Sequence, residues 1–428
     1  MIKQFTVLGM STLIRLLTGF VLFVLIAREW GAGRFGEFMY FFAVAGLLVQ
    51  VCEYGFSQQI LREIGRDPDT TRQRMGVYFA TKLWLTMFAW IFAGIFALVT
   101  GLRADGAATL GLLLLAATLM SYSDFLMACF RALGHYGKEA SVTLEGNVAY
   151  FGLALAAVLF GAEGTGVAAA MVLGRIVHLL ATVVEFRRHV PGSIKVDVRF
   201  GAVWPVMRGG GAYGLDVGVA TAFANLDTVL LAILLGYESV GVYQAGARFY
   251  QGASLLPSIF AGIFLPRMAR AAEDPVEFGL LARNLYWSTL AIAFAVCGVF
   301  VIGAEGQAWI YPEPSLQDVG ALMPWFGLLV LIRFIAASQG ITVTALGGQT
   351  VRAKLFLVAL ALMVASAFPF VEAFGLTGMI LAISVAYAFL SIGFWVWVER
   401  QGVRTRPSLG VAVFASILAA TLILKLKS

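Results

Sequence analysis

Three arginines lie near the midpoints of long apolar runs, where a charged side chain is costly to place. Arg15, Arg175 and Arg333 have apolar sequence on both sides. A charge at the centre of a bilayer costs about 2.5–3.5 kcal/mol on insertion scales, so such residues are kept for pairing, hydration or ligand binding. A guanidinium binds two phosphate oxygens at once. Together with Arg248, which lies inside another run, these arginines predict a substrate-binding site for a phosphate-bearing headgroup.

Six further ionisable residues in apolar runs are candidates for ion coupling. They are Glu53, Asp124, Glu145, His178, Asp216 and Asp227. Two alternatives stay open from the sequence alone. Arg15 also fits a structural ion pair with Asp216 or Asp227, and His178 also fits a hydrogen-bonded core histidine instead of a proton relay. Lys82, near the end of its run, is expected to extend its ammonium to the membrane surface.

The runs that carry these charges identify a polytopic membrane protein. The 428 residues are 60% hydrophobic and 13% charged, with a mean hydropathy of +0.88, whereas soluble domains are about 45–50% apolar and about 25% charged. Runs of about 20 residues predict helical spans. They are 5–27, 38–60, 76–100, 107–129, 141–161, 165–185, 209–235, 242–265, 285–304, 320–345, 355–374 and 377–398. We therefore expect an all-α protein with about 12 transmembrane helices and a possible thirteenth, short segment at 409–424.

Lysines and arginines predict the orientation of these spans. The amino terminus and alternate loops hold 19 of them, and the opposite loops hold only Arg28, Arg34 and Arg103. Basic loops stay in the cytoplasm, so the amino terminus and the 399–408 segment are expected there. The net charge of +6 is accordingly a sign of membrane topology, and no nucleic-acid partner is expected.

The chain repeats itself once. The segment Ala27–Phe38 matches Ala232–Tyr243 at an offset of 205, and Ala132–Gly134 matches Ala345–Gly347 at an offset of 213, while Gly166 matches Gly378 at 212. Each repeat has six spans, so the repeats are parallel, an arrangement typical of transporters with two lobes around a central cavity. We expect an N-terminal lobe (1–190), a cytoplasmic connector (191–208), a C-terminal lobe (209–400) and a tail with a short apolar helix (401–428).

Motifs for a cofactor, a metal or catalysis are not supported. Gly31-x-Gly33-x-x-Gly36 and Gly209-x-Gly211-x-x-Gly214 fit the dinucleotide-binding spacing, but neither follows a strand. The three cysteines are far apart in the sequence and predict neither a disulfide framework nor a metal site. We expect no catalytic residue, no metal and no cofactor.

The seventh and eighth spans carry the residues of a family resemblance. Asn225-Leu226-Asp227, Gly236, Val240-Gly241-Val242-Tyr243, Arg248, Leu256-Pro257 and Pro266-Arg267 resemble a signature of bacterial polysaccharide flippases. These O-antigen and exopolysaccharide repeat-unit translocases belong to the multidrug/oligosaccharidyl-lipid/polysaccharide exporter superfamily. The first repeat is similar from Gly31 to Phe38 and at Glu53-Tyr54-Gly55, with Glu53 where an Asp is common.

The resemblance implies a flippase of the bacterial cytoplasmic (inner) membrane. Its substrate would be an undecaprenyl-diphosphate-linked oligosaccharide, moved by alternating access for polysaccharide or lipopolysaccharide biosynthesis, with H⁺ or Na⁺ as coupling ion. Its partners would be the lipid bilayer and other polysaccharide-assembly membrane proteins. The resemblance favours no single residue as the ion site.

Three alternatives remain. A drug/cation exporter of the same superfamily would be expected to have an acidic central site, which three mid-span arginines disfavour. A peptidoglycan-precursor flippase usually has fourteen spans. A membrane glycosyltransferase or polymerase would need catalytic groups on an outer loop, where Arg28, Arg34 and Arg103 are the basic residues.

Overall fold

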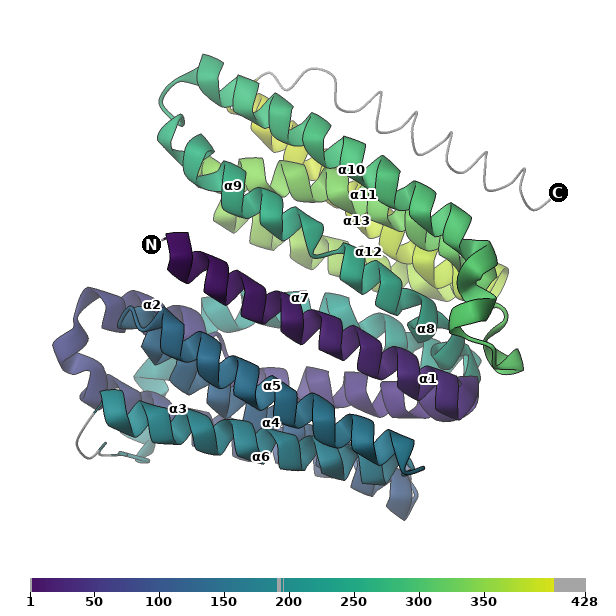
Figure 1. The fold of residues 1–428 in the computed structure, drawn as a ribbon. Helices are drawn as coiled ribbons and strands as arrows, with labels where there is room; N and C mark the ends of the chain where they lie inside the picture. The colour runs from purple at the N-terminus through teal and green to yellow at the C-terminus, as the bar shows by residue number, and fades with distance from the viewer. Residues whose placement is uncertain (1, 191–193, 195, 404–428) are drawn as a thin grey trace. The chain divides into compact units, whose positions relative to one another are not determined.

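The computed structural model describes residues 2–190, 194 and 196–403, without the side chains of 2–13, 16, 68, 212 and 216. These residues form helices, with no strand among them (Figure 1). The helices are α1 (Ile2–Glu53), α2 (Phe56–Arg66), α3 (Thr71–Val99), α4 (Ala104–Ala132), α5 (Tyr136–Leu159), α6 (Gly164–His189), α7 (Phe200–Leu235), α8 (Tyr237–Ala253), α9 (Leu256–Arg270), α10 (Pro275–Ile310), α11 (Val319–Ala345), α12 (Gln349–Phe374) and α13 (Leu376–Arg400). Short 3₁₀ turns, η1 (Pro68–Thr70) and η2 (Pro314–Leu316), precede α3 and α11.

Within the described ranges, eleven helical segments are long and apolar enough to cross a membrane. The first of them, Leu17–Arg66, has 50 residues, and Gly31 divides it with a non-helical backbone. A span needs about 20 residues, so this segment provides two of the expected twelve. The expected all-α, polytopic architecture is therefore confirmed, whereas the 409–424 run lies outside the described residues.

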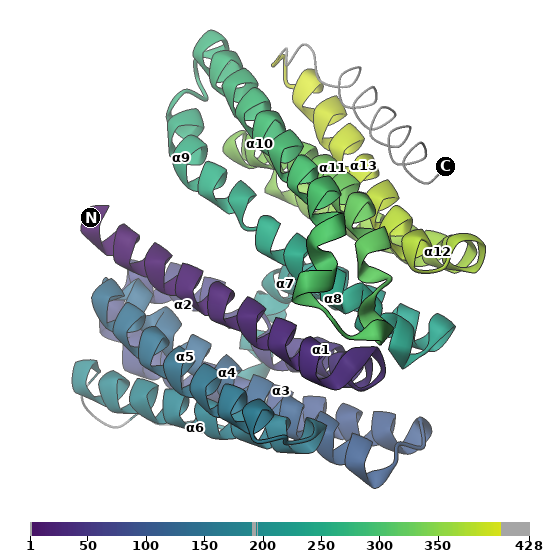
Figure 2. The ribbon, with the colours of Figure 1, turned by 45° about the vertical axis from the view of Figure 1, so that its right-hand side comes forward.

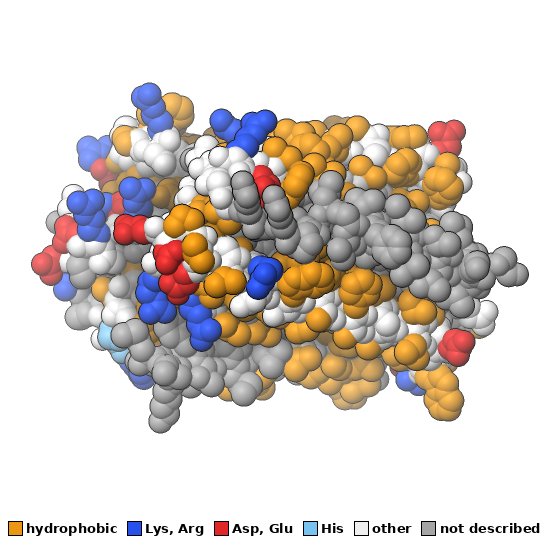
Figure 3. Space-filling view, turned by 90° about the horizontal axis from the view of Figure 1, so that it is seen from above, with side chains coloured by type: hydrophobic (Ala, Val, Ile, Leu, Met, Phe, Trp, Pro, Cys, Tyr) orange, Lys and Arg blue, Asp and Glu red, His pale blue; other side chains and the backbone are white. Residues whose placement is uncertain are grey.

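Large apolar side chains on the outside of the helices are consistent with a lipid environment. Phe160, Trp309 and Leu98 are 91%, 87% and 83% exposed, which water would disfavour but hydrocarbon would not. In the space-filling view, hydrophobic side chains cover the middle, and Lys and Arg side chains gather toward the left (Figure 3). This segregation of apolar and basic side chains is the pattern that membrane insertion requires.

The chain divides into two compact units by its contacts. The first unit is 1–29 with 37–229, and the second is 30–36 with 230–428. Within the first unit, polar contacts tie α7 to α1 and to the residues that follow it directly. Tyr54 Oη donates to Met207 O at 2.9 Å, and Thr221 Oγ1 donates to Gln50 Oε1 at 2.7 Å. The lobe boundaries at 190 and 209 stay a prediction.

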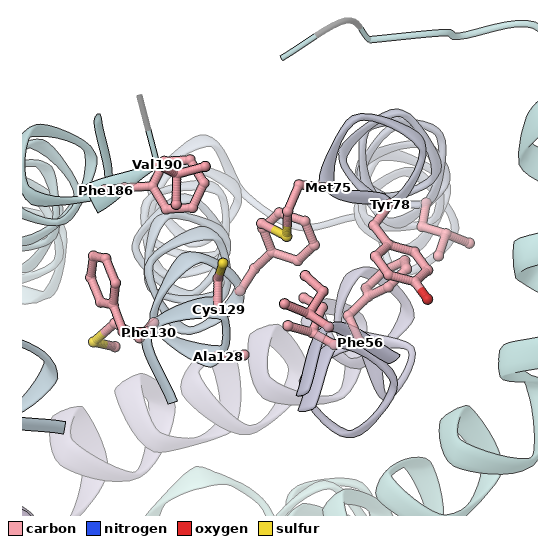
Figure 4. Close-up of a cluster of buried hydrophobic side chains, with 13 residues drawn as sticks. Phe56, Met75, Tyr78, Ala128, Cys129, Phe130, Phe186 and Val190 are labelled. Atoms are coloured by element: carbon pink, nitrogen blue, oxygen red, sulfur yellow. The ribbon is translucent and has the colours of Figure 1, made fainter. Parts of the chain in front are cut away.

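In the first unit, α6 packs against α4 and α5, and α4 packs against α2. A cluster of buried apolar side chains joins α2, α3, α4 and the end of α6. Figure 4 shows Phe56 and Tyr78 on one side of this cluster, Phe130 and Phe186 on the other, and Cys129 between them. This core holds the break between α1 and α2 against α3 and α4.

In the second unit, α11 is the central helix. Helices α8, α9, α10 and α13 contact it, and α12 packs against α13. Figure 2 shows α10, α11 and α13 side by side. Most of α11 is apolar and buried, so its one arginine, Arg333, stands in the interior of this unit.

The two repeats have the same backbone at the junction between their first and second spans. Gly31 has φ 70° and ψ 178°, and Gly236, 205 residues later, has φ 84° and ψ 176°. This region of backbone space is open essentially to glycine alone. The offset read from the sequence thus relates two positions that need glycine for the same conformational reason.

The junctions also contact each other reciprocally, inside the second unit. A Cβ at Gly36 would lie 1.7 Å from Tyr237 O, and a Cβ at Gly241 would lie 1.9 Å from Ala32 O. The offset of 205 relates Gly36 to Gly241 and Ala32 to Tyr237. Each repeat therefore presents the same glycine to the same carbonyl of the other, which is direct structural evidence of the duplication.

Candidate functional site

Arg175 is positioned in the first unit by close packing of α6 on α5. A Cβ at Gly174 would lie 2.4 Å from Tyr150 Cα, so the glycine lets the two helices approach. The Arg175 guanidinium then lies over the Tyr150 ring, 3.8 Å from its centroid. Arg175 Nη1 is buried and has no hydrogen-bond partner among the described residues. The ring stabilises the cation, and one donor stays available to an acceptor.

His178 lies one turn beyond Arg175, on the same face of α6. Its side chain is 0% exposed and packs against Gly146 of α5, where a Cβ would lie 2.2 Å from the ring. In the part of the chain that the structure describes, neither ring nitrogen has a hydrogen-bond partner. The proton-relay role of His178 and its alternative, a hydrogen-bonded core histidine, both stay predictions.

Asp124 on α4 connects the candidate cations of this unit. Its carboxylate interacts electrostatically with Arg15, Arg175, Arg131 and Lys82. The structure thus brings together Arg15, Arg175 and Asp124, three residues that the sequence identified separately. Glu139 also interacts electrostatically with Arg15, and an ion pair of Arg15 with Asp216 or Asp227 stays a prediction.

Two other carboxylates identified from the sequence, Asp227 and Glu145, accept hydrogen bonds from neighbours on their own helices. Asp227 is 8% exposed and accepts hydrogen bonds from the backbone N–H and hydroxyl of Thr228 at 2.7 and 3.1 Å. Glu145 is exposed and accepts from Ser141 Oγ at 3.0 Å. The Asp216 side chain lies outside the described residues. A role for these three residues in ion coupling stays a prediction.

Lys82 was predicted to extend its ammonium to the membrane surface, and this prediction is wrong. Its side chain is 1% exposed and does not reach the membrane surface. Its Nζ donates to Cys52 O at 2.9 Å and to Ser121 Oγ at 2.6 Å. The rings of Tyr122, Phe56 and Phe125 lie 5.1, 5.6 and 5.7 Å from Nζ, and aromatic faces attract a cation.

The break between α1 and α2 explains why Lys82 turns inward. Helix α1 ends at Glu53, and Tyr54 and Gly55 have φ 40° and 69° before α2 begins. The last carbonyls of a helix lack intrahelical donors and carry the negative end of its dipole. The Cys52 carbonyl is one of these, so the break itself provides an acceptor for the ammonium.

Glu53 completes this group of polar side chains. Its carboxylate interacts electrostatically with Asp124 and Lys82, and the Ser121 hydroxyl donates a hydrogen bond to it. Ser121 therefore accepts from Lys82 and donates to Glu53. We call Glu53, Lys82, Ser121 and Asp124 the break cluster, after the helix break beside which they lie.

In the second unit, Arg333 is enclosed by two tyrosines. Its Nη1 donates to Tyr250 Oη at 2.6 Å, and its guanidinium lies 5.2 Å from the Tyr250 ring and 5.4 Å from the Tyr387 ring. Arg248 lies on α8. Its Nη1 donates a hydrogen bond to Gln251 Oε1 at 3.0 Å. The sequence placed Arg333 and Arg175 in one site, but they lie in different units, and the shared cavity stays a prediction.

Parts of this chain match known proteins in sequence. A family model described as polysaccharide biosynthesis protein matches residues 1–272. The capsular polysaccharide biosynthesis protein CapF of Staphylococcus aureus is 22% identical over 196 residues, which are 44% of this chain and 48% of CapF. The match thus spans about half the length of that relative.

Two solved structures share the fold over nearly the whole chain. An inward-facing multidrug resistance transporter of the MATE family in the MOP superfamily has a TM-score of 0.70 at 16% identity, covering 94% of this chain and 97% of that one. The lipid II flippase MurJ, in an inward closed conformation, has a TM-score of 0.71 at 13% identity, covering 98% of each chain. These structures establish the fold, and the extent of the family match establishes that the chain belongs to the polysaccharide biosynthesis protein family.

Proposed function

We propose that this protein is a flippase that moves an undecaprenyl-diphosphate-linked oligosaccharide from the cytoplasmic to the periplasmic leaflet of the bacterial inner membrane. Arg175 carries the proposal, because its buried Nη1 has no acceptor among the described residues and suits a phosphate oxygen. Arg15 and Arg333 would supply further positive charge at mid-depth, and Arg248 would bind nearer the membrane surface. The family membership agrees with a role in polysaccharide assembly.

The diphosphate and Asp124 would compete for the same cations. Asp124 interacts with both Arg15 and Arg175, so the empty site is partly neutralised by the protein's own carboxylate. A headgroup with two phosphates offers more oxygen acceptors than one carboxylate, and a guanidinium binds them in a bidentate manner. The headgroup would therefore displace Asp124 from the arginines while the polyprenyl tail stays in lipid.

Substituting arginine by lysine tests the phosphate role. Arg175→Lys retains the charge but removes the planar fork, and we expect repeat-unit export to fall by about 10-fold or more. Export is measured as surface polysaccharide in a complemented deletion strain, beside the amount of protein in the membrane. Export equal to wild type at equal abundance would contradict a bidentate phosphate site.

The predicted orientation of the spans in the membrane can be tested with reporter fusions. With both ends of the twelve-span core in the cytoplasm, a reporter enzyme that is active only outside the membrane should remain inactive when fused after Gln401. The same reporter fused after Arg103, in a loop expected outside, should be active. Activity after Gln401 would overturn the orientation and the direction of transport that depends on it.

A further inference from the structure

The ammonium of Lys82 has the surroundings of a bound monovalent cation. A backbone carbonyl at a helix end and a hydroxyl accept its hydrogen bonds, from Cys52 at 2.9 Å and Ser121 at 2.6 Å. Oxygen atoms of these kinds also coordinate hard metal ions, and carbonyls at interrupted transmembrane helices are used for cations in transporters. The position that an external ion would take is here filled by a side chain.

The ring faces around Nζ decide which cation suits this place. Three aromatic rings lie within 5.7 Å of it, and such cages favour ammonium groups. A sodium ion would need several oxygen ligands in place of these rings. The surroundings therefore fit an ammonium, and the lysine supplies one with no cost of capturing it from solution.

The charged and titratable groups that face Lys82 come from two of the helices around it. They are Cys52 and Glu53 on α1, and Tyr122 and Asp124 on α4, with Arg15 and Arg175 acting through Asp124. Helix α2 contributes Phe56, which does not titrate. Two carboxylates thus face the ammonium, and Glu53 is joined to it through Ser121.

We propose that the break between α1 and α2 is a cation site filled by the protein's own Lys82 ammonium, and that the ion exchanged there is a proton instead of sodium. The ammonium gives a proton to the Ser121 oxygen while the Ser121 hydroxyl gives its proton to the Glu53 carboxylate. One N–H bond breaks, one O–H bond forms on Glu53, and Ser121 ends with its hydroxyl restored. Lysine and glutamate become neutral together, so the step leaves no isolated charge in the membrane.

Chemical rescue tests the site, independently of any transport function. Lys82→Ala removes the ammonium and leaves its oxygens and rings, whereas Lys82→Met refills the space with a neutral chain. In purified full-length protein at constant ionic strength, we expect Lys82→Ala in choline chloride to lose about 5 °C or more of Tm. Methylammonium chloride should restore most of this loss in a saturable manner, and it should not affect wild type or Lys82→Met.

Each possible result of the rescue experiment leads to a different conclusion about the site. A Lys82→Ala protein with the same Tm in choline and methylammonium would overturn the site, and better rescue by sodium than by methylammonium would overturn its preference for ammonium. If Lys82→Ala is obtained only in methylammonium, removing that cation by dialysis should unfold it; persistence of the fold would contradict the proposal. Ser121→Ala, which keeps the lysine, should lower Tm by less than Lys82→Ala.

The proton claim rests on the proposed function and is tested in proteoliposomes. Wild type should move lipid-linked oligosaccharide under a pH gradient with sodium fully replaced by choline. A strict requirement for sodium would overturn the proton claim. Absence of any transport, with methylammonium rescue of Lys82→Ala intact, would refute the flippase and leave the cation site standing.

Discussion

The two units hold their buried cations in different ways. In the first unit, Lys82 and Arg175 lie near the carboxylates of Glu53 and Asp124. In the second, Arg333 lies between the rings of Tyr250 and Tyr387, and its strongest interactions are with those two tyrosines. One unit therefore combines its cations with carboxylates, and the other holds its arginine between tyrosine rings.

The repeat shows how this difference arose from equivalent positions. The offset of 213 that relates Ala132–Gly134 to Ala345–Gly347 places Asp124 on Ala337, and the offset of 212 that relates Gly166 to Gly378 places Arg175 on Tyr387. The aspartate of the first unit has become an alanine in the second, so the second unit has no carboxylate at that place. We infer that ion exchange belongs to the first unit and constant attraction of the anionic substrate to both.

The strongest test of this comparison removes one arginine from each unit. We expect Arg175→Ala and Arg333→Ala each to lower export by about 10–100-fold, the worth of a charge-assisted hydrogen bond. Arg333→Ala should also lower Tm, because it leaves the Tyr250 hydroxyl without its donor. Arg188→Ala, an exposed arginine on the same helix as Arg175, should change neither quantity. Loss of export from only one of the two variants would confine substrate binding to that unit.

Neutralising the first unit's glutamate tests where ions exchange. Glu53→Gln retains the shape and the hydrogen bond from Ser121 but cannot accept a proton. We expect transport under a pH gradient to fall by about 10-fold, while transport down a substrate gradient alone persists. Glu29→Gln, at an exposed position on the same helix and outside the break cluster, is the matched control. An unchanged response of Glu53→Gln to the pH gradient would assign coupling to another group.

The reciprocal glycines test the equivalence of the repeats. Gly36→Ala and Gly241→Ala place a Cβ 1.7 and 1.9 Å from a backbone carbonyl oxygen, and overpacking of this kind costs about 1–3 kcal/mol or more of the free energy of unfolding. Gly33→Ala, with no atom within 4 Å of its added Cβ, should be as stable as wild type. Very unequal effects of the two reciprocal substitutions would contradict a symmetric junction.

The smallest effect is expected for the second unit's tyrosine. Tyr250→Phe keeps the ring against Arg333 but removes the hydroxyl that accepts at 2.6 Å. We expect a loss of about 1–2 kcal/mol in the free energy of unfolding, seen as a lower Tm, with export within a few-fold of wild type. A large loss of export at normal Tm would mean that the hydroxyl itself contacts substrate.

Much of the fold could be predicted because a bilayer-spanning helix needs a long apolar run, and cytoplasmic loops are enriched in basic residues. Long apolar runs, basic alternate loops and the repeat at an offset of 205 led to the spans and to the junctions at Gly31 and Gly236. Helix ends were less accessible: α7 begins at Phe200, inside the segment assigned to the connector. A helix can extend beyond the hydrocarbon, and hydropathy does not register that extension.

The site could be predicted only in part. Depth in the apolar run identified Arg15 and Arg175, and Asp124, identified as an available acidic partner, interacts electrostatically with both. Lys82 was missed because a lysine near a span end normally extends to the surface. The signal was present in Glu53-Tyr54-Gly55, since a glycine inside a span can interrupt the helix and free a carbonyl. The direction of the ammonium depends on its contacts with Cys52 and Ser121 on other helices. Sequence spacing does not show which helices pack together.

The most direct test of the account follows a labelled undecaprenyl-diphosphate oligosaccharide across proteoliposomes that contain the purified protein. We predict that wild type moves the lipid between leaflets, and that the Arg15→Ala, Arg175→Ala, Arg333→Ala triple variant, folded with a sharp thermal transition, moves it no faster than protein-free vesicles. Translocation by that triple variant at the wild-type rate would contradict the claim that the mid-span arginines bind the diphosphate headgroup.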